Sequence, residues 1–82
     1  MAEADVRLPR IGGRYRHFKG NDYRVLAIAR HSETGEALVI YRQLYGDGGV
    51  WARPASMFFD TVVRDGRVFK RFSEAAEPEN GE

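Results

Sequence analysis

The chain has 82 residues, with 13 lysines and arginines, 12 aspartates and glutamates, two histidines and no cysteine. A chain of this length forms one small domain that buries roughly 60% of its unfolded surface. The absence of cysteine excludes a disulfide framework, a thiolate nucleophile and cysteine-ligated zinc or iron–sulfur sites. No stretch approaches the ~18 apolar residues of a membrane span, and the N-terminus lacks a signal-peptide pattern. We therefore expect a soluble, cytoplasmic protein with no membrane partner.

The two ends of the chain differ in composition from its middle. Residues 1–12 mix charged and small residues around Pro9, and we expect a flexible N-terminal arm. Residues 73–82 contain no aromatic or branched apolar side chain, so burial cannot offset the entropy lost on ordering them. We expect a disordered acidic tail there. The predicted folded unit is a small β-barrel domain at residues 13–72.

Short runs of branched and aromatic residues alternate with glycine, asparagine and aspartate, which is typical of an all-β protein. Strands are expected at residues 14–18, 23–30, 37–43 and 50–53. Pro54 cannot pair within a sheet and favours a 3-10 turn at 54–57. A final hairpin is expected from 58–63 and 67–72 around Arg64-Asp65-Gly66. Five to six short strands with one 3-10 turn predict a small SH3-like half-open barrel, with an OB-like barrel as the alternative.

Apolar side chains occupy both faces of two expected strands. In residues 23–30, Val25 and Ala27 alternate with Leu26 and Ile28, and residues 37–43 repeat the pattern. One face of each strand points into the core. The other must be solvated, covered by the N-terminal arm or used as an interface, and self-association is one way to cover it.

His31-Ser32-Glu33 places a base, a hydroxyl and a carboxylate next to one another in sequence. Adjacent strand residues point to opposite faces, whereas a Ser/His/acid set must be oriented together beside an oxyanion hole. We therefore favour a turn in which Ser32 and Thr34 bind the local backbone. A small hydrolase or metal-dependent enzyme centred on His31 and Glu33 remains an alternative.

The two histidines, His17 and His31, are the residues best suited to bind a metal. They form no H-x-H or H-x-x-x-H pair, and a site would need Glu33, Glu36 or Asp47 as further ligands. The glycines fall between strands and form no phosphate-binding motif. We predict no catalytic residue, no metal and no cofactor.

Aromatic residues and arginines are interleaved through the expected domain. Such a mixture is found at protein–protein hot spots, in peptide-binding barrels and in grooves for single-stranded nucleic acid. The simplest reading places Trp51, Met57 and Phe58 in the core and the arginines on the outer faces. The residues concerned are Tyr15, Tyr23, Tyr41, Tyr45, Trp51, Phe58 and Phe59, with Arg14, Arg16, Arg24, Arg42 and Arg53.

Several long, colinear motifs are similar to those of a known family. They are residues 13–21 (GRYRHFKGN), 29–36 (ARHSETGE), 44–47 (LYGD), 51–54 (WARP) and 57–58 (MF). Over residues 13–72 the chain resembles the bacterial family catalogued as domain of unknown function 1653 (DUF1653). The resemblance implies a compact, β-rich, SH3-like module and carries no activity, substrate or cofactor.

Some residues of these motifs are polar or aromatic, and the need to form turns does not fully explain their presence. Arg53 is expected to pair with Glu33 or Glu36, and the alternative is that it lies beside Trp51 to bind an anion. We hypothesise a patch that recognises a protein or peptide, with single-stranded nucleic acid as the alternative ligand. The candidate residues are His17, Tyr23, His31, Glu33, Glu36, Tyr45, Trp51 and Arg53.

The formal net charge of +1 is the sum of unlike parts. Residues 11–72 hold eleven lysines and arginines against six acids, which gives +5, whereas the four glutamates of residues 73–82 give −4. An acidic tail beside a basic, arginine-rich domain could screen that surface from polyanions or keep the protein soluble.

Overall fold

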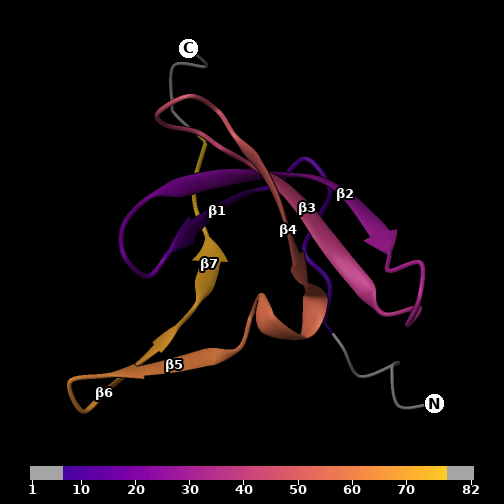
Figure 1. Ribbon diagram of the computed structural model, residues 1–82. Coiled ribbons are helices and arrows are strands. Elements are labelled where there is room, and N and C mark those ends of the chain that lie inside the picture. The colour runs from indigo at the N-terminus through magenta and orange to yellow at the C-terminus, as the bar shows by residue number, and fades with distance from the viewer. Residues whose placement is uncertain (1–6, 78–82) are drawn as a thin grey trace.

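The computed structural model describes residues 7–77 and shows an all-β protein (Figure 1). In this range lie seven β-strands and a single 3-10 turn. Among these residues no helix is long and apolar enough to cross a membrane. The elements are β1 (Arg14–His17), β2 (Asp22–Arg30), β3 (Ala37–Gln43), β4 (Val50–Pro54), η2 (Ala55–Met57), β5 (Thr61–Arg64), β6 (Arg67–Lys70) and β7 (Phe72–Glu74).

Five of the strands form one antiparallel sheet in the order β4-β3-β2-β1-β7. The last strand therefore pairs with the first, with His17 opposite Phe72. Strands β5 and β6 form a separate two-stranded ribbon that extends away from this sheet (Figure 1). The ribbon turns tightly at Asp65 and Gly66, whose φ angles of 54° and 76° fit a hairpin turn that favours aspartate followed by glycine.

A β-bulge interrupts the pairing of β2 with β3 between Val25 and Ala27. Val25 is fully buried and Leu26 is exposed. Because a bulge offsets the alternation of side chains along a strand, Val25 and Ile28 both reach the core side although they are three residues apart. The bulge thus explains why β2 carries apolar residues that a strict alternation would place on opposite faces.

The core lies on one face of the five-stranded sheet and is closed by the segment after β4. Phe58, which follows η2, stacks on Phe72 of β7 with ring centroids 4.2 Å apart and planes within 3°. Both rings are buried and Tyr15 contacts the edge of Phe58. The buried core residues are Tyr15, Val25, Val39, Tyr41, Ala55, Phe58 and Phe72.

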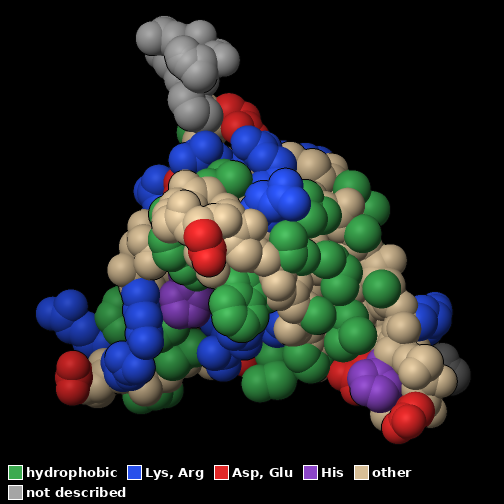
Figure 2. All heavy atoms as spheres, turned by 45° about the horizontal axis from the view of Figure 1, so that its top comes forward, with side chains coloured by type: hydrophobic (Ala, Val, Ile, Leu, Met, Phe, Trp, Pro, Cys, Tyr) green, Lys and Arg blue, Asp and Glu red, His purple; other side chains and the backbone are tan. Residues whose placement is uncertain are grey.

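The opposite face of the sheet carries a row of arginines across three strands. Arg14 lies opposite Arg24, which lies opposite Arg42. Asp22 accepts hydrogen bonds from Arg14 at 2.8 Å and from Arg16 at 2.7 and 3.1 Å. Alternation places Leu26, Ile40 and Val50 on this same side, and Figure 2 shows apolar side chains gathered over part of the surface.

The all-β class and the 3-10 turn are confirmed, whereas the five-stranded sheet is neither closed nor strongly curled. Its edges are β4 and β7, which do not pair with each other.

The segment 67–72, expected as one strand, is divided between β6 of the ribbon and β7 of the large sheet. Arg71 occupies the break. Its amide donates to the carbonyl of Asp60, and its guanidinium forms two hydrogen bonds with the Asp60 carboxylate, at 2.8 and 3.1 Å. This contact redirects the chain so that Phe72 enters the core.

The described residues beyond the expected domain also contact it. The Arg7 guanidinium lies 3.9 Å from the ring centroid of Phe59, and the amide of Arg10 donates to the hydroxyl of Tyr15. At the other end β7 continues to Glu74, and Glu77 binds Arg24 at 2.6 and 3.1 Å. Residues 1–6 of the expected arm and 78–82 of the expected tail lie outside the described range.

Candidate functional site

The eight candidate residues do not form one site. His31, Glu33 and Glu36 lie at the β2–β3 turn, whereas the other five lie on β1, β2, β4 and the β3–β4 loop. Figure 2 shows the two histidines on separate parts of the surface, with carboxylates beside one of them. The structure therefore separates the polar turn from the aromatic residues.

At the β2–β3 turn, side chains of His31 and Thr34 form hydrogen bonds that stabilise the turn itself. Nδ1 of His31 accepts hydrogen bonds from the amides of Glu33 and Thr34 at 3.1 and 3.3 Å. The Thr34 hydroxyl accepts from the amide of Glu36 at 3.2 Å, as expected for a turn hydroxyl. Among residues 7–77 no three histidine, aspartate or glutamate side chains are grouped so that they could hold a metal ion.

Tyr23 and Tyr45 form the centre of the aromatic group. Their hydroxyl oxygens are 2.6 Å apart and their rings meet edge to face at 5.5 Å. Tyr23 also contacts the buried rings of Tyr41 and Phe72 edge to face. Burial, followed by the hydrogen bond with Tyr45, raises the pKa of Tyr23, so this hydroxyl stays protonated at neutral pH.

Trp51 lies opposite Tyr41 on the neighbouring strand and leaves 55% of its surface exposed. Its indole Nε1 donates to Oε1 of Gln43 at 2.7 Å. The side-chain nitrogen Nε2 of Gln43 in turn donates to the backbone carbonyl of Tyr45, at 3.3 Å. Gln43 therefore holds the exposed indole in one orientation and connects it to the Tyr45 loop.

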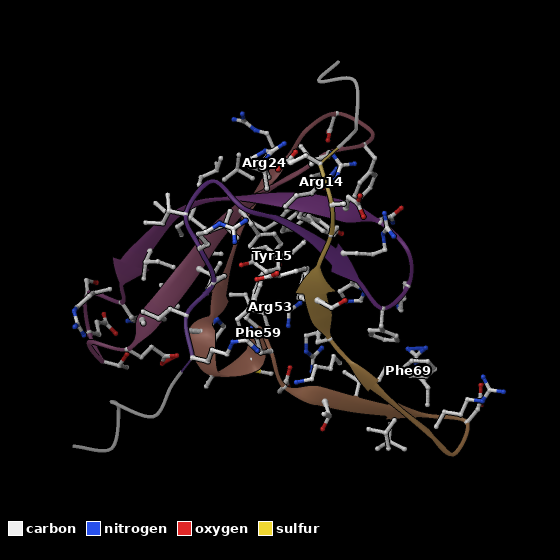
Figure 3. All side chains as sticks on the ribbon, turned by 180° about the vertical axis from the view of Figure 1, so that it is seen from behind. Arg14, Tyr15, Arg24, Arg53, Phe59 and Phe69 are labelled. Atoms are coloured by element: carbon white, nitrogen blue, oxygen red, sulfur yellow. The ribbon has the colours of Figure 1, made fainter. Side chains whose placement is uncertain are left out.

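Arg53 lies on the same side of β4 as Trp51. Its Nε donates to the hydroxyl of Tyr41 at 3.3 Å, and its guanidinium carbon is 5.8 Å from the ring centroid of Phe72 (Figure 3). The expected pairing of Arg53 with Glu33 or Glu36 is wrong, because the structure has no such ion pair among residues 7–77. Both glutamates lie in the β2–β3 turn, whereas the guanidinium of Arg53 lies beside the hydroxyl of Tyr41 and the ring of Phe72.

Two exposed aromatic rings and a cation thus occupy one surface. We call this surface the aromatic patch and define it as Tyr23, Tyr45, Trp51 and Arg53. Tyr45 is 39% exposed, so the patch offers both a flat apolar area and a positive charge. The candidate list left out the residues that support the patch, Tyr41, Gln43 and Phe72, because their roles depend on cross-strand neighbours.

His17 adjoins these rings from β1. Its ring contacts the edge of Phe72 at 4.9 Å, and its Nδ1 accepts from the amide of Lys19 at 3.2 Å. Burial lowers the pKa of His17, and the positive charges of Arg53, Lys19 and Arg71 lower it further. A neutral ring is also the form in which Nδ1 can accept a hydrogen bond.

We expect His17 to make the protein less stable in mild acid. The unfolded chain takes up a proton near pH 6.5, whereas the folded protein resists protonation until a lower pH. The stabilisation is therefore complete above the unfolded pKa and is lost as the pH falls through the folded pKa. Urea unfolding at about pH 7.5 and about pH 5.5 checks this, since a His17→Gln variant should lose less stability between them than the wild type. Equal losses in both proteins would contradict the assignment.

A family model described as "Protein of unknown function (DUF1653)" matches residues 13–74. The chain belongs to the DUF1653 family. It is also similar to the crystal structure of a DUF1653 protein from Bordetella bronchiseptica, with 33% sequence identity and a TM-score of 0.71. That similarity covers 92% of this chain and 96% of the other. The comparison with curated proteins gave no match. The resemblance noted in the sequence is thus confirmed, and the DUF1653 match includes β7, two residues beyond the expected domain end.

Proposed function

We propose that this DUF1653 domain is a non-enzymatic binding module that recognises an extended protein segment through the aromatic patch. The observation that carries the proposal is that Trp51 and Tyr45 are exposed and that Arg53 shares the side of β4 that carries Trp51. Tryptophan, tyrosine and arginine dominate the binding energy of protein interfaces. Placing two exposed aromatic rings and a cation together gives such an interface its apolar centre and one charged contact.

The strand arrangement supports an SH3-like module. The last strand pairs with the first, and a 3-10 turn follows the fourth strand of the sheet. Small barrels and half-open sheets of this kind bind peptides on exposed aromatic side chains. We propose a proline-rich segment as the ligand, because its extended polyproline conformation loses little entropy on binding to aromatic rings.

The patch is arranged before any ligand arrives. The hydrogen bond from Trp51 to Gln43 and the contact between the Tyr23 and Tyr45 hydroxyls fix three side chains. A ligand therefore meets side chains whose rotamer entropy has already been lost, which favours affinity. One of the Tyr23 and Tyr45 hydroxyls donates to the other, so the second hydroxyl and the Arg53 guanidinium are left to donate to the carbonyls that a proline-rich segment presents.

Trp51 is the single tryptophan of the chain, so its fluorescence reports directly on the patch. We expect a proline-rich peptide selected from an array to shift its emission on binding. Tyr45→Ala should weaken that binding by about tenfold or more, because an exposed aromatic at the centre of an interface is a typical hot spot. Trp51→Ala, followed with a labelled peptide, should have an effect at least as large.

Val63→Ala is the control, since Val63 is exposed on the ribbon outside the aromatic patch. It should leave peptide affinity unchanged. The proposal fails if no peptide of the array shifts the Trp51 emission, or if Val63→Ala weakens binding as much as Tyr45→Ala does.

A further inference from the structure

A second surface feature lies between the β1–β2 turn and the β5–β6 ribbon. It is a hollow of about 480 Å³ lined by six residues, which we call the ribbon notch: Phe18, Lys19, Arg64, Asp65, Arg67 and Phe69. None of these residues belongs to the aromatic patch. Figure 3 shows Phe69 out on the ribbon, well away from Arg53.

The notch carries three cations and one carboxylate. Lys19, Arg64 and Arg67 line it together with Asp65, and among residues 7–77 none of the three cations forms an ion pair. Three arginines of the sheet differ in this respect, since Arg14, Arg16 and Arg24 each bind a carboxylate. Across the ribbon Arg64 lies opposite Arg67, so two like charges are held side by side. An anion between them would relieve that repulsion.

Aromatic rings form the other part of the notch. Phe18 and Phe69 stack with ring centroids 5.6 Å apart and planes within 22°, although one comes from the turn and the other from β6. The Arg64 guanidinium carbon lies 5.5 Å from the centroid of the Phe18 ring. Because side chains two apart share a strand face, Arg67 and Phe69 point to the same side of β6. The notch therefore places cations beside a stacked pair of rings.

We propose that the ribbon notch binds single-stranded nucleic acid. Lys19, Arg64 and Arg67 contact successive phosphates, and a base stacks against the ring pair of Phe18 and Phe69. A single strand presents both phosphates and flat bases, which match the cations and the exposed edge of the ring pair in the notch. An acidic peptide would satisfy the cations but would leave the rings without a regular stacking partner. This site is separate from the aromatic patch and does not depend on the proposed peptide binding.

Fluorescence anisotropy with labelled oligo(dT) and oligo(U) of about ten nucleotides tests the proposal on the full chain. We expect binding at low salt that weakens as salt rises, with a log–log slope of about −0.7 for each phosphate contact. Arg67→Glu should weaken binding by about tenfold or more and make the slope shallower by at least about 0.7. Phe69→Leu, which keeps apolar bulk, should weaken binding by about fivefold through lost stacking.

Arg42→Glu is the matched control, because Arg42 is also exposed on a strand and also lies opposite an arginine, Arg24. It should change affinity much less than Arg67→Glu, and Tyr45→Ala should leave oligonucleotide binding unchanged. Circular dichroism confirms that each variant is folded. The proposal is overturned if the wild type does not bind at low salt, or if Arg42→Glu and Arg67→Glu weaken binding equally. It is also overturned if a duplex or a poly-glutamate peptide of equal charge binds as tightly as the single strand.

Discussion

Replacing Phe58 with alanine is expected to remove most of the stability of this domain. The Phe58 ring is fully buried, stacks on Phe72 at 4.2 Å and contacts Tyr15 and Tyr41 edge to face. Removing a buried phenylalanine ring costs about 3–5 kcal/mol through lost transfer energy and the cavity left behind. Native domains are stable by only about 5–15 kcal/mol, and a domain this small lies at the lower end. Urea unfolding followed by circular dichroism measures the change.

Phe59→Ala provides a matched control, because Phe59 is the next residue and also an aromatic ring. Phe59 is half-buried and lies beneath the Arg7 guanidinium, at 3.9 Å. Its removal exposes less apolar surface and leaves a site that solvent can fill, so its loss of stability should be clearly smaller. Equal losses in the two variants would show that Phe58 is not the centre of the core.

Asp22→Asn is the second substitution for which we expect a large effect. The Asp22 side chain is 10% exposed and receives three hydrogen bonds, from Arg14 and from two nitrogens of Arg16. Neutralising the carboxylate leaves two guanidinium groups next to each other without a counter-charge. Charge-assisted hydrogen bonds contribute about 1.5–3 kcal/mol each, so we expect an overall loss of about 2 kcal/mol after solvent screening of the more exposed Arg16.

The same contact predicts how stability changes in acid. The hydrogen bond from Arg16, and then those from Arg14 and the two positive charges, hold the pKa of Asp22 below its usual range despite partial burial. Stability from this group is therefore present above the unfolded pKa, near 3.9, and is lost as the pH falls through the lower folded pKa. Asp22→Asn should flatten the acid limb of the stability profile. Asp65→Asn makes the same chemical change at an exposed turn and should leave stability at neutral pH nearly unchanged.

Local sequence signals predict much of the fold. The ranges of β2 and β3 follow from runs of branched and aromatic residues, and Pro54 marks the change from β4 to the 3-10 turn. Asp65-Gly66 gives the ribbon turn because both residues tolerate positive φ. These features depend on neighbouring residues along the chain, which a single sequence displays.

The separation of β6 from β7 could not be predicted in that way. Residues 67–72 contain a valine and two phenylalanines, which favour one strand, and no turn residue says that Phe72 joins a different sheet. The break depends on Arg71 binding Asp60, which is a contact across the chain. The pairing of Arg24 with Glu77 could not be predicted from local sequence either, because the two residues are 53 positions apart.

The candidate site, like the fold, depends partly on contacts between distant residues that local sequence does not predict. Trp51, Met57 and Phe58 are all large apolar residues near the 3-10 turn, yet the structure buries Phe58 and exposes the other two. Composition alone cannot make that distinction, since the exposure of Trp51 depends on its place on β4, an edge strand of the sheet. The ribbon notch likewise joins Phe18 with Phe69, residues that meet only through the fold.

The pairing of β7 with β1 also determines when the protein can fold during its synthesis. Phe72, which completes the core, lies in the last strand of the domain, and this strand hydrogen-bonds to the first. A nascent polypeptide that ends before this residue lacks both an edge of the sheet and the ring that stacks on Phe58. Because such distant contacts must form before they stabilise anything, we expect the domain to fold only after nearly all of it has left the ribosome.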